Sequence, residues 1–342
     1  HKRARVRPGQ RDRVAQTRRG CRRPTGERRD HVPLAQARLV RRASLDDRAQ
    51  HDSALDAQLP GPLGRQLVDL DPEPAPVDPP GVDDLLEHAL GDVAGDVEIA
   101  AMDLEDFGSI AKFTSDYMET GRALDVLINN AGIMACPEGR IGPGWERQLA
   151  VNHLAHMAMS MALAPAMERS KAARLVALSS TAHVRSDIVW DDPNFESHPY
   201  DKWEAYGQSK SACALFALGV DRRGREIGIR AFSVHPGGIF TPLQRHLSDE
   251  EMAALGWKNP DGTIPPQVQA MFKTPEQGAS TSVWAATSPS LDGMGGVYCE
   301  DCDVAQLATP ESQRWEHARE WICDDDKAER LWAISEEMLR NA

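Results

Sequence analysis

From about Asp96 onward, short apolar runs alternate with longer segments that have a helical period. The apolar runs predict buried strands at residues 97–102, 124–128, 175–178, 229–234 and 295–298. The segments between them predict helices at residues 104–120, 145–167 and 206–220, one that opens at Thr274-Pro-Glu-Gln277, and one at 315–339. Strands that alternate with long helices are typical of a parallel sheet covered on both faces, so we expect a doubly wound α/β fold.

The first 95 residues have no such pattern. Seven prolines lie between Pro60 and Pro80, and proline interrupts helices and central strands. Only residues 82–90 favour a short helix. We therefore expect residues 1–95 to be an irregular, low-complexity segment rich in Arg and Pro, and residues 96–342 to form a single domain.

Composition strengthens this division. The 342 residues carry a net charge of −13 and are 41% hydrophobic, which is enough for a core. Residues 1–50 hold 16 Lys+Arg against 5 Asp+Glu, and residues 51–98 hold 1 against 12. The first 98 residues contain no Ile, Met, Phe, Tyr, Trp or Asn. Because most of these residue types have AT-rich codons, we hypothesise that residues 1 to about 95 are a frame-shifted or misjoined segment.

The candidate chemistry begins with Tyr206-Gly-Gln-Ser-Lys210, on a predicted helix. Residues four apart on a helix lie on one face, so the phenol and the ammonium become neighbours. A phenol with a pKa near ~10 is a poor base at neutral pH, and a nearby positive charge favours the phenolate. Such a pair suits proton transfer to or from an alcohol oxygen, although the spacing alone is common in helices.

Further motifs lie where predicted strands end. Asn129-Asn130-Ala131-Gly132, Ser179-Ser180 and Pro236-Gly237 each follow an apolar run, and Asn152 lies in the helix between the first two. Open α/β sheets bind ligands at the carboxyl ends of their strands. With Tyr206 and Lys210, this set of motifs resembles the short-chain dehydrogenases/reductases over about residues 96–342. The Ser-Ser-x-Ala-His sequence at 179–183 is similar to the branch with retinol dehydrogenases and WW-domain oxidoreductase.

The resemblance implies an NAD(P)-dependent oxidoreductase that interconverts an alcohol and its carbonyl. It implies that Tyr206 exchanges the proton, Ser180 stabilises the substrate oxygen, Lys210 tunes Tyr206 and holds the nicotinamide ribose, and Asn152 positions a relay water. The cofactor contacts that it implies are Asp103, Leu104, Asn130, Ala131, Gly132, Tyr206, Lys210, Pro236, Gly237 and Thr241. It slightly favours NADP over NAD, and it places a substrate lid at about residues 243–271. Its assembly would be a homodimer or a homotetramer.

One part of that family's pattern is missing. A strand and a Thr-Gly-x-x-x-Gly-x-Gly turn, which bind the pyrophosphate, should fall near residues 50–60. The sequence there has no apolar strand, and Gly61 and Gly64 lack the required spacing. The Rossmann-like sheet would therefore lack its first β-α-β unit. This keeps open an alternative: a catalytically defective relative that cannot bind cofactor.

Other features support different functions weakly. The Arg-rich start could make a nucleic-acid-binding protein, but it has no aromatic residues for stacking, so we expect no nucleic-acid partner. Cys299-x-x-Cys302 and the His153/His156 pair have metal-ligand spacings, yet neither has further ligands nearby in sequence, so we expect no metal. We expect no leader, and the sequence has no run of 18 apolar residues and only 6 Cys. We expect a cytoplasmic protein without a membrane span.

Overall fold

The structure is a computed structural model that describes residues 98–341. The predicted irregular segment at 1–95, its short helix at 82–90 and the region expected to hold the glycine-rich turn lie outside the described residues. The seven strands are β1 Val126–Asn129, β2 Arg140–Ile141, β3 Trp145–Glu146, β4 Ala173–Leu178, β5 Ile229–His235, β6 Val297–Glu300 and β7 Asp303–Val304 in the part described.

The α-helices in the described range are α3 Phe107–Glu119, α4 Arg147–Leu149, α5 Ala155–Ser170, α6 Lys202–Gly224, α7 Asp249–Ala254, α8 Pro266–Met271, α9 Pro275–Thr287 and α10 Asp325–Arg340. A π-helical turn, Ala150–Leu154, joins α4 to α5. Short 3-10 helices lie at Thr181–Arg185, Arg225–Ile227, Pro242–His246, Pro289–Leu291 and Glu320–Cys323.

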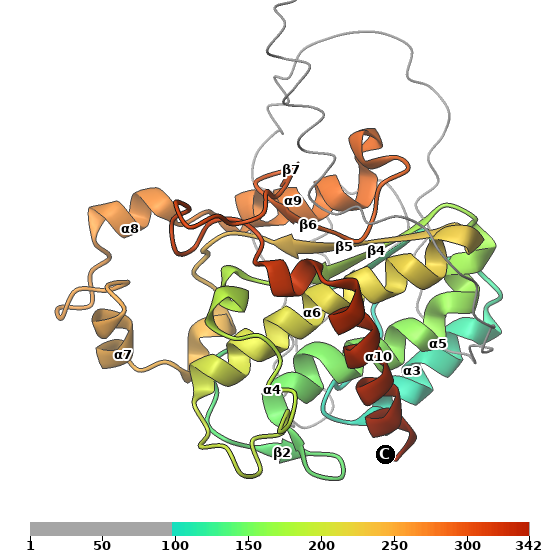
Figure 1. Cartoon of the computed structure of the whole chain (residues 1–342), viewed down its shortest axis with the longest axis horizontal. Helices are drawn as coiled ribbons and strands as arrows, with labels where there is room; N and C mark the ends of the chain where they lie inside the picture. The colour runs from blue at the N-terminus through green and yellow to red at the C-terminus, as the bar shows by residue number, and fades with distance from the viewer. Residues whose placement is uncertain (1–97, 342) are drawn as a thin grey trace, which may run out of the picture.

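The main sheet has the strand order β1-β4-β5-β6-β7. Strands β1, β4, β5 and β6 run parallel to one another, and β7 pairs antiparallel to β6. Helices α5 and α6 cover one face, with α3 beside α5 and α10 against α6, while α9 covers the other face (Figure 1). This confirms the predicted α/β fold with helices on both faces.

Strand β1 is an edge of the described sheet. It pairs with β4 alone among residues 98–341, and its Ile128 side chain is 40% exposed. The strand predicted at 97–102 is wrong for the residues that the structure describes, because 98–102 have no regular structure. A strand needs a neighbour for its backbone N–H and C=O groups, and no described strand lies on the open side of β1.

Three predicted helices begin later than expected. The helix predicted at 104–120 begins at Phe107, after its N-cap Asp106. The helix predicted at 145–167 begins at Arg147, because β3 pairs with β2 and the Glu146 carboxylate accepts from the Gln148 and Leu149 amides. The helix predicted at 315–339 begins at Asp325, where Asp324 caps it. Residues before it are held elsewhere, since Ala318 exchanges backbone hydrogen bonds with residues 306 and 308.

The segment that follows β5 forms the region predicted as a lid. It contains Pro242–His246, α7 and α8, and α7 and α8 project beyond the sheet on the left of Figure 1. The next helix, α9, begins as predicted: Thr274 is its N-cap, and the Gln277 side chain completes the capping box. No helix within residues 98–341 has the length and apolarity to cross a bilayer.

Candidate active site

The ends of β1, β4 and β5 lie side by side. Asn129 is in register with Ala177, and Leu178 is in register with Val234. The Ser179 amide extends the β4–β5 ladder by donating to the Val234 carbonyl at 2.8 Å. The sheet therefore brings together the turns that carry Asn130, Ser180 and Pro236, as predicted for the carboxyl edge of a parallel sheet.

Helix α6 supplies Tyr206 and Lys210. Asp201 starts the helix by accepting from the Trp203 and Glu204 amides. Both side chains are buried, Tyr206 at 4% exposure and Lys210 at 6%, and the ammonium lies 5.7 Å from the centre of the phenol ring. The predicted neighbour relation between phenol and ammonium is therefore present.

Gly207 brings α6 close to the segment that follows Ser180. A Cβ at this position would lie 2.9 Å from the Ala182 carbonyl oxygen and 3.0 Å from the Arg185 Cβ. Any larger residue would push the helix away from the 3-10 helix Thr181–Arg185. The glycine next to Tyr206 thus sets how closely the tyrosine and serine segments approach.

Both the side chain and the backbone of Lys210 are hydrogen-bonded to the end of β4. Its ammonium donates to the Leu178 carbonyl oxygen at 3.0 Å, and its own carbonyl accepts from the Ser179 hydroxyl at 2.7 Å. An ammonium has three hydrogens, so this geometry leaves donors for a hydroxyl of a ligand.

Ser180 lies in an extended conformation as the N-cap of Thr181–Arg185. Its hydroxyl oxygen accepts from the Ala182 amide at 3.1 Å. Accepting this bond orients the side chain and leaves the hydroxyl hydrogen as a donor for a substrate oxygen.

His183 holds the backbone of Ser180. Its Nδ1 lies 2.7 Å from the Ser180 carbonyl oxygen, and its Nε2 accepts from the Arg319 amide at 3.2 Å. Together these bonds require the neutral imidazole with its hydrogen on Nδ1. Burial, and next the Arg319 charge, lower the pKa of His183 to about 4. Burial likewise lowers the pKa of His156 to about 4.

We expect a decrease in pH to destabilise the fold from about pH 6.5 downward, which is above the pH range in which most carboxylates titrate. Native His156 and His183 resist protonation down to about pH 4, whereas the unfolded chain takes up these protons below about 6.5. The stabilisation is present above pH 6.5 and falls by about 1.4 kcal/mol per pH unit for each histidine as pH decreases. Urea unfolding at pH 7.5, 6 and 5 measures this slope, and His183→Asn should reduce it. An unchanged unfolding free energy over this range would contradict the assignment.

Asn152 lies in the π-helical turn and organises the turn after β1. Its Oδ1 accepts from the Ile133 amide, and its Nδ2 donates to the Ile133 carbonyl and to the Ser209 hydroxyl, each at 2.9 Å. Both amide hydrogens are thus used within the protein. The observed contacts hold the 130–133 turn against α6, and the relay water remains a prediction.

That turn borders the Lys210 ammonium. A Cβ at Gly132 would lie 2.8 Å from the Asn152 Oδ1 and 3.7 Å from the Lys210 Nζ, while Asn130 and Ala131 are exposed. The preceding Asn129 is buried and donates to Ser160, and its Oδ1 has no hydrogen-bond partner among the described residues. The backbone of the turn is therefore open to a ligand on the side where Lys210 lies.

The remaining predicted cofactor residues lie further from Tyr206 along the chain. Pro236 and Gly237 leave β5, with Gly237 at φ +101° against the Lys273 side chain, and Thr241 caps Pro242–His246. The Asp103 carboxylate accepts from the Glu105 amide, and Leu104 is buried in the core before α3. No hydrogen bond, ion pair or ring contact joins these residues to Tyr206 or Lys210 within residues 98–341.

The donor set fits one half of a nicotinamide dinucleotide. Two hydroxyls and an ammonium, from Ser180, Tyr206 and Lys210, suit a carbonyl substrate and the ribose next to the nicotinamide. The residues that the structure describes contain no glycine-rich turn for the pyrophosphate. The fit therefore extends to the nicotinamide end alone.

Sequence reasoning missed the aromatic side chains around Tyr206. Trp203 meets the Tyr206 ring edge-on at 6.4 Å, and Trp257, in the segment predicted as a lid, meets Trp203 at 6.3 Å. With Leu247 and Met252 they form one apolar cluster. Trp203 precedes Tyr206 by three residues, so helical spacing could have placed it on the same face, whereas nothing in the sequence connects Trp257 to it.

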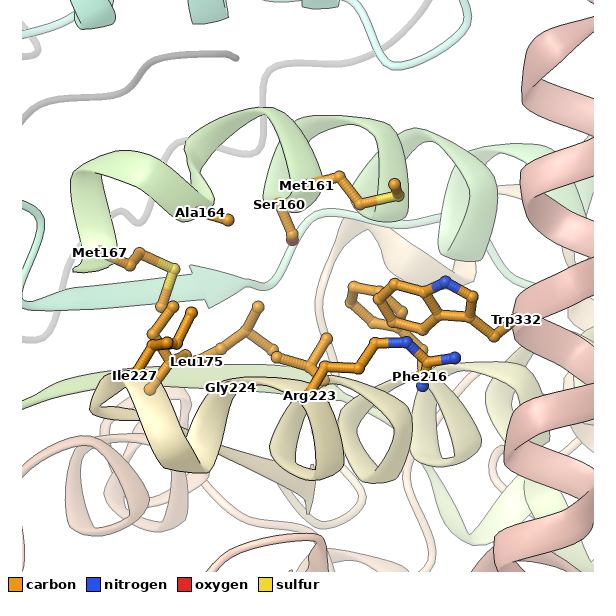
Figure 2. Close-up of a pocket in the computed structure, with 12 residues that line it drawn as sticks. Ser160, Met161, Ala164, Met167, Leu175, Phe216, Arg223, Gly224, Ile227 and Trp332 are labelled. Atoms are coloured by element: carbon orange, nitrogen blue, oxygen red, sulfur yellow. The ribbon is translucent and has the colours of Figure 1, made fainter. Parts of the chain in front are cut away.

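A separate apolar pocket lies between α5, α6 and α10 (Figure 2). Met161 and Met167 from α5, Phe216 from α6 and Trp332 from α10 point into it. None of the predicted site residues lines this pocket. It is packing space outside the carboxyl edge of the sheet.

The metal-like spacings form no ligand cluster. Within residues 98–341, no group of three or more His, Cys, Asp or Glu side chains is placed to hold a metal ion. Cys299 is buried in β6, while Cys302 is exposed in the turn between β6 and β7. Burial, with Asp303 and Glu300 nearby, raises the pKa of Cys299 to about 12, so the thiol stays protonated.

Comparison with known proteins gives consistent matches. Residues 82–252 match the family model described as short chain dehydrogenase. A "Probable oxidoreductase" of Streptomyces lividans is 40% identical over 262 residues, which are 76% of this chain and 86% of that protein. Human retinol dehydrogenase 14 is 33% identical over 250 residues, 72% of this chain and 67% of that protein. A crystal structure of an uncharacterised protein from Mycobacterium paratuberculosis is 29% identical in sequence. The match covers 74% of this chain and 80% of that protein's chain, with a TM-score of 0.48.

Proposed function

The chain belongs to the short-chain dehydrogenase/reductase family, in its retinol-dehydrogenase-like branch, and we propose that it interconverts an alcohol and its carbonyl with NAD(P). The observation that carries this proposal is the Tyr206–Lys210 pair on α6, fixed beside Ser180 through the Leu178 and Ser179 contacts. Members of this family are oxidoreductases that use a nicotinamide dinucleotide.

In the direction of reduction, Tyr206 gives its hydroxyl proton to the carbonyl oxygen as the carbon accepts a hydride. Hydride donation and acceptance are the chemistry that a bound nicotinamide supplies. The Ser180 hydroxyl donates to the same oxygen and stabilises its developing negative charge. Lys210 stabilises the phenolate left on Tyr206 and binds the ribose hydroxyls. Asn152 holds the 130–133 turn and positions the relay water that returns a proton.

Access to the site is controlled from the segment after β5. Residues 243–271 form the substrate lid of a catalytic domain that spans residues 96–342. Trp257 on this lid contacts Trp203, which contacts Tyr206, and this places an apolar wall over the reacting group. Such a wall excludes water and strengthens the charge interactions that Ser180 and Lys210 make.

The experiment that tests the proposal is an equilibrium titration of the full chain with NADPH and with NADH. Tryptophan fluorescence reports binding, because the chain has 8 Trp and Trp203 lies next to Tyr206. We expect saturable binding of both cofactors, with a lower Kd for NADPH. A lower Kd for NADH would contradict the NADP preference.

A further inference from the structure

Arg185 lies between two tryptophans near the candidate active site. It ends the 3-10 helix that Ser180 begins, and its guanidinium lies 5.0 Å from the Trp203 ring centre and 5.1 Å from the Trp315 ring centre. These rings come from α6 and from the loop before Glu320–Cys323. Contact with two aromatic faces holds the guanidinium in place and keeps water from part of it.

This guanidinium has no acceptor for its hydrogens among residues 98–341, where the Arg185 side chain makes neither a hydrogen bond nor an ion pair. Asp201 is the acidic residue whose charge acts on the Arg185 guanidinium. The Asp201 carboxylate is already used as the N-cap of α6, where it accepts from the Trp203 and Glu204 amides. Arg185 is only partly buried, and its five N–H donors are available to a ligand.

Two more arginines lie close by. The Arg314 guanidinium lies 4.7 Å from the Trp315 ring centre, and the Arg319 side chain donates to the Arg314 carbonyl at 2.6 Å. Neither forms an ion pair within the described range, although acids outnumber Lys and Arg by 52 to 39 in the chain. Burial, and next the Arg314 charge, lower the pKa of Arg185. Positive charge thus gathers here without an ion-pair partner among residues 98–341.

Trp203 connects this cluster to the reacting group. The Trp203 ring makes three contacts: with the Tyr206 ring, with Trp257 of the lid, and with the Arg185 guanidinium. A ring-sized apolar substrate that reaches Tyr206 along this wall would have its far end near Arg185. The planar guanidinium matches a carboxylate in geometry and can donate two parallel hydrogen bonds to it.

We propose that Arg185 is a substrate-binding residue that pairs with a carboxylate, so that the enzyme acts on an apolar, ring-bearing hydroxy acid or oxo acid. This rests on the proposed oxidoreductase function for the position of the reacting carbon. The carboxylate supplies the ion-pair partner that Arg185 lacks among residues 98–341, and Arg314 adds to its attraction. The alcohol or carbonyl then lies at the Tyr206 end of the wall.

Calorimetric titration of the full chain with 2-naphthoate and with 2-naphthamide tests this proposal. The two probes share a ring system and differ in charge. We expect naphthoate to bind about 10-fold or more tightly than naphthamide, because a charge-assisted pair is worth at least that factor. In Arg185→Gln the two affinities should become equal, and Arg185→Lys should give an intermediate ratio with an unchanged thermal midpoint.

Arg330→Gln is the matched control. Arg330 also stacks on a tryptophan, with its guanidinium 4.5 Å from the Trp190 ring centre, but it has Asp191 as a partner at 3.9 Å. This variant should keep the naphthoate preference. Equal binding of the two probes by the unaltered chain would overturn the proposal, as would an unchanged preference in Arg185→Gln. Inorganic phosphate that binds as tightly as naphthoate would assign the cluster to phosphate and also overturn it.

Binding of these probes needs neither cofactor nor turnover. A chain that binds naphthoate through Arg185 but no nicotinamide cofactor would refute the oxidoreductase function and leave the anion site standing. A chain that binds NADPH but does not prefer naphthoate would refute the anion site at Arg185 and leave the oxidoreductase function standing.

Discussion

Tyr206→Phe is expected to lower kcat by about 10²- to 10⁴-fold, the usual contribution of a positioned general acid or base. The substitution removes one oxygen from a ring that is 4% exposed and leaves the ring contacts with Trp203 unchanged. The fold should therefore remain, and the loss should fall on the proton-transfer step. Oxidation of NADPH with a panel of ring-bearing aldehydes, ketones and oxo acids measures it.

Tyr298→Phe provides the matched control for that measurement. Tyr298 is a buried phenol in β6 whose hydroxyl has no hydrogen-bond partner in the described structure. Removing its oxygen should leave kcat within a few-fold of the unaltered chain. Retention of activity in Tyr206→Phe, or an equal loss in both variants, would show that Tyr206 is not the acid.

Asp221→Ala is expected to lower the free energy of unfolding by about 3 kcal/mol. Asp221 is 5% exposed on α6, and its carboxylate accepts from the Arg230 guanidinium at 2.7 and 3.1 Å and from the Ala231 amide at 3.2 Å. The substitution leaves a guanidinium and a buried amide unpaired at the point where α6 meets β5. The cost lies at the low end for a buried pair because a quarter of the Arg230 side chain is exposed.

Asp116→Ala is the comparison for a pair in water. Asp116 lies 2.6 Å from Lys112 on α3, with 61% and 77% of the two side chains exposed. Because solvent screens such pairs, its loss should cost less than about 1 kcal/mol. Urea unfolding of both variants measures the difference. Equal losses would mean that the Asp221 contacts do not join α6 to the sheet.

The strands that form the parallel sheet were predictable because each is rich in apolar residues, as buried parallel strands are. Their observed bounds differ from the predicted ones by a few residues. The β2–β3 hairpin and β7 could not be predicted, since strands of two residues carry no periodicity. The late start of α10 could not be predicted either. The backbone of residue 318 pairs with residues 306 and 308, and this pairing overrides the local preference for a helix.

The local part of the site was predictable and the long-range part was not. Tyr206 and Lys210 share one helix, so their spacing alone predicted their contact. Asn152 was placed in the site by resemblance, whereas its bonds to Ile133 and Ser209 depend on how three segments fold together. The Arg185 position had no signal at all, because Trp203 and Trp315 are 112 residues apart. Such contacts are products of the tertiary fold.

The NADPH titration of the full chain tests the central claim most directly, since it requires no knowledge of the substrate. We predict saturable quenching of tryptophan fluorescence with a micromolar Kd, and a weaker affinity in Lys210→Met, which loses the ammonium next to Gly132. The Arg330→Gln variant should bind as the unaltered chain does. Absence of saturable binding of both NADPH and NADH at millimolar concentration would contradict the account and identify the chain as a relative that has lost its cofactor.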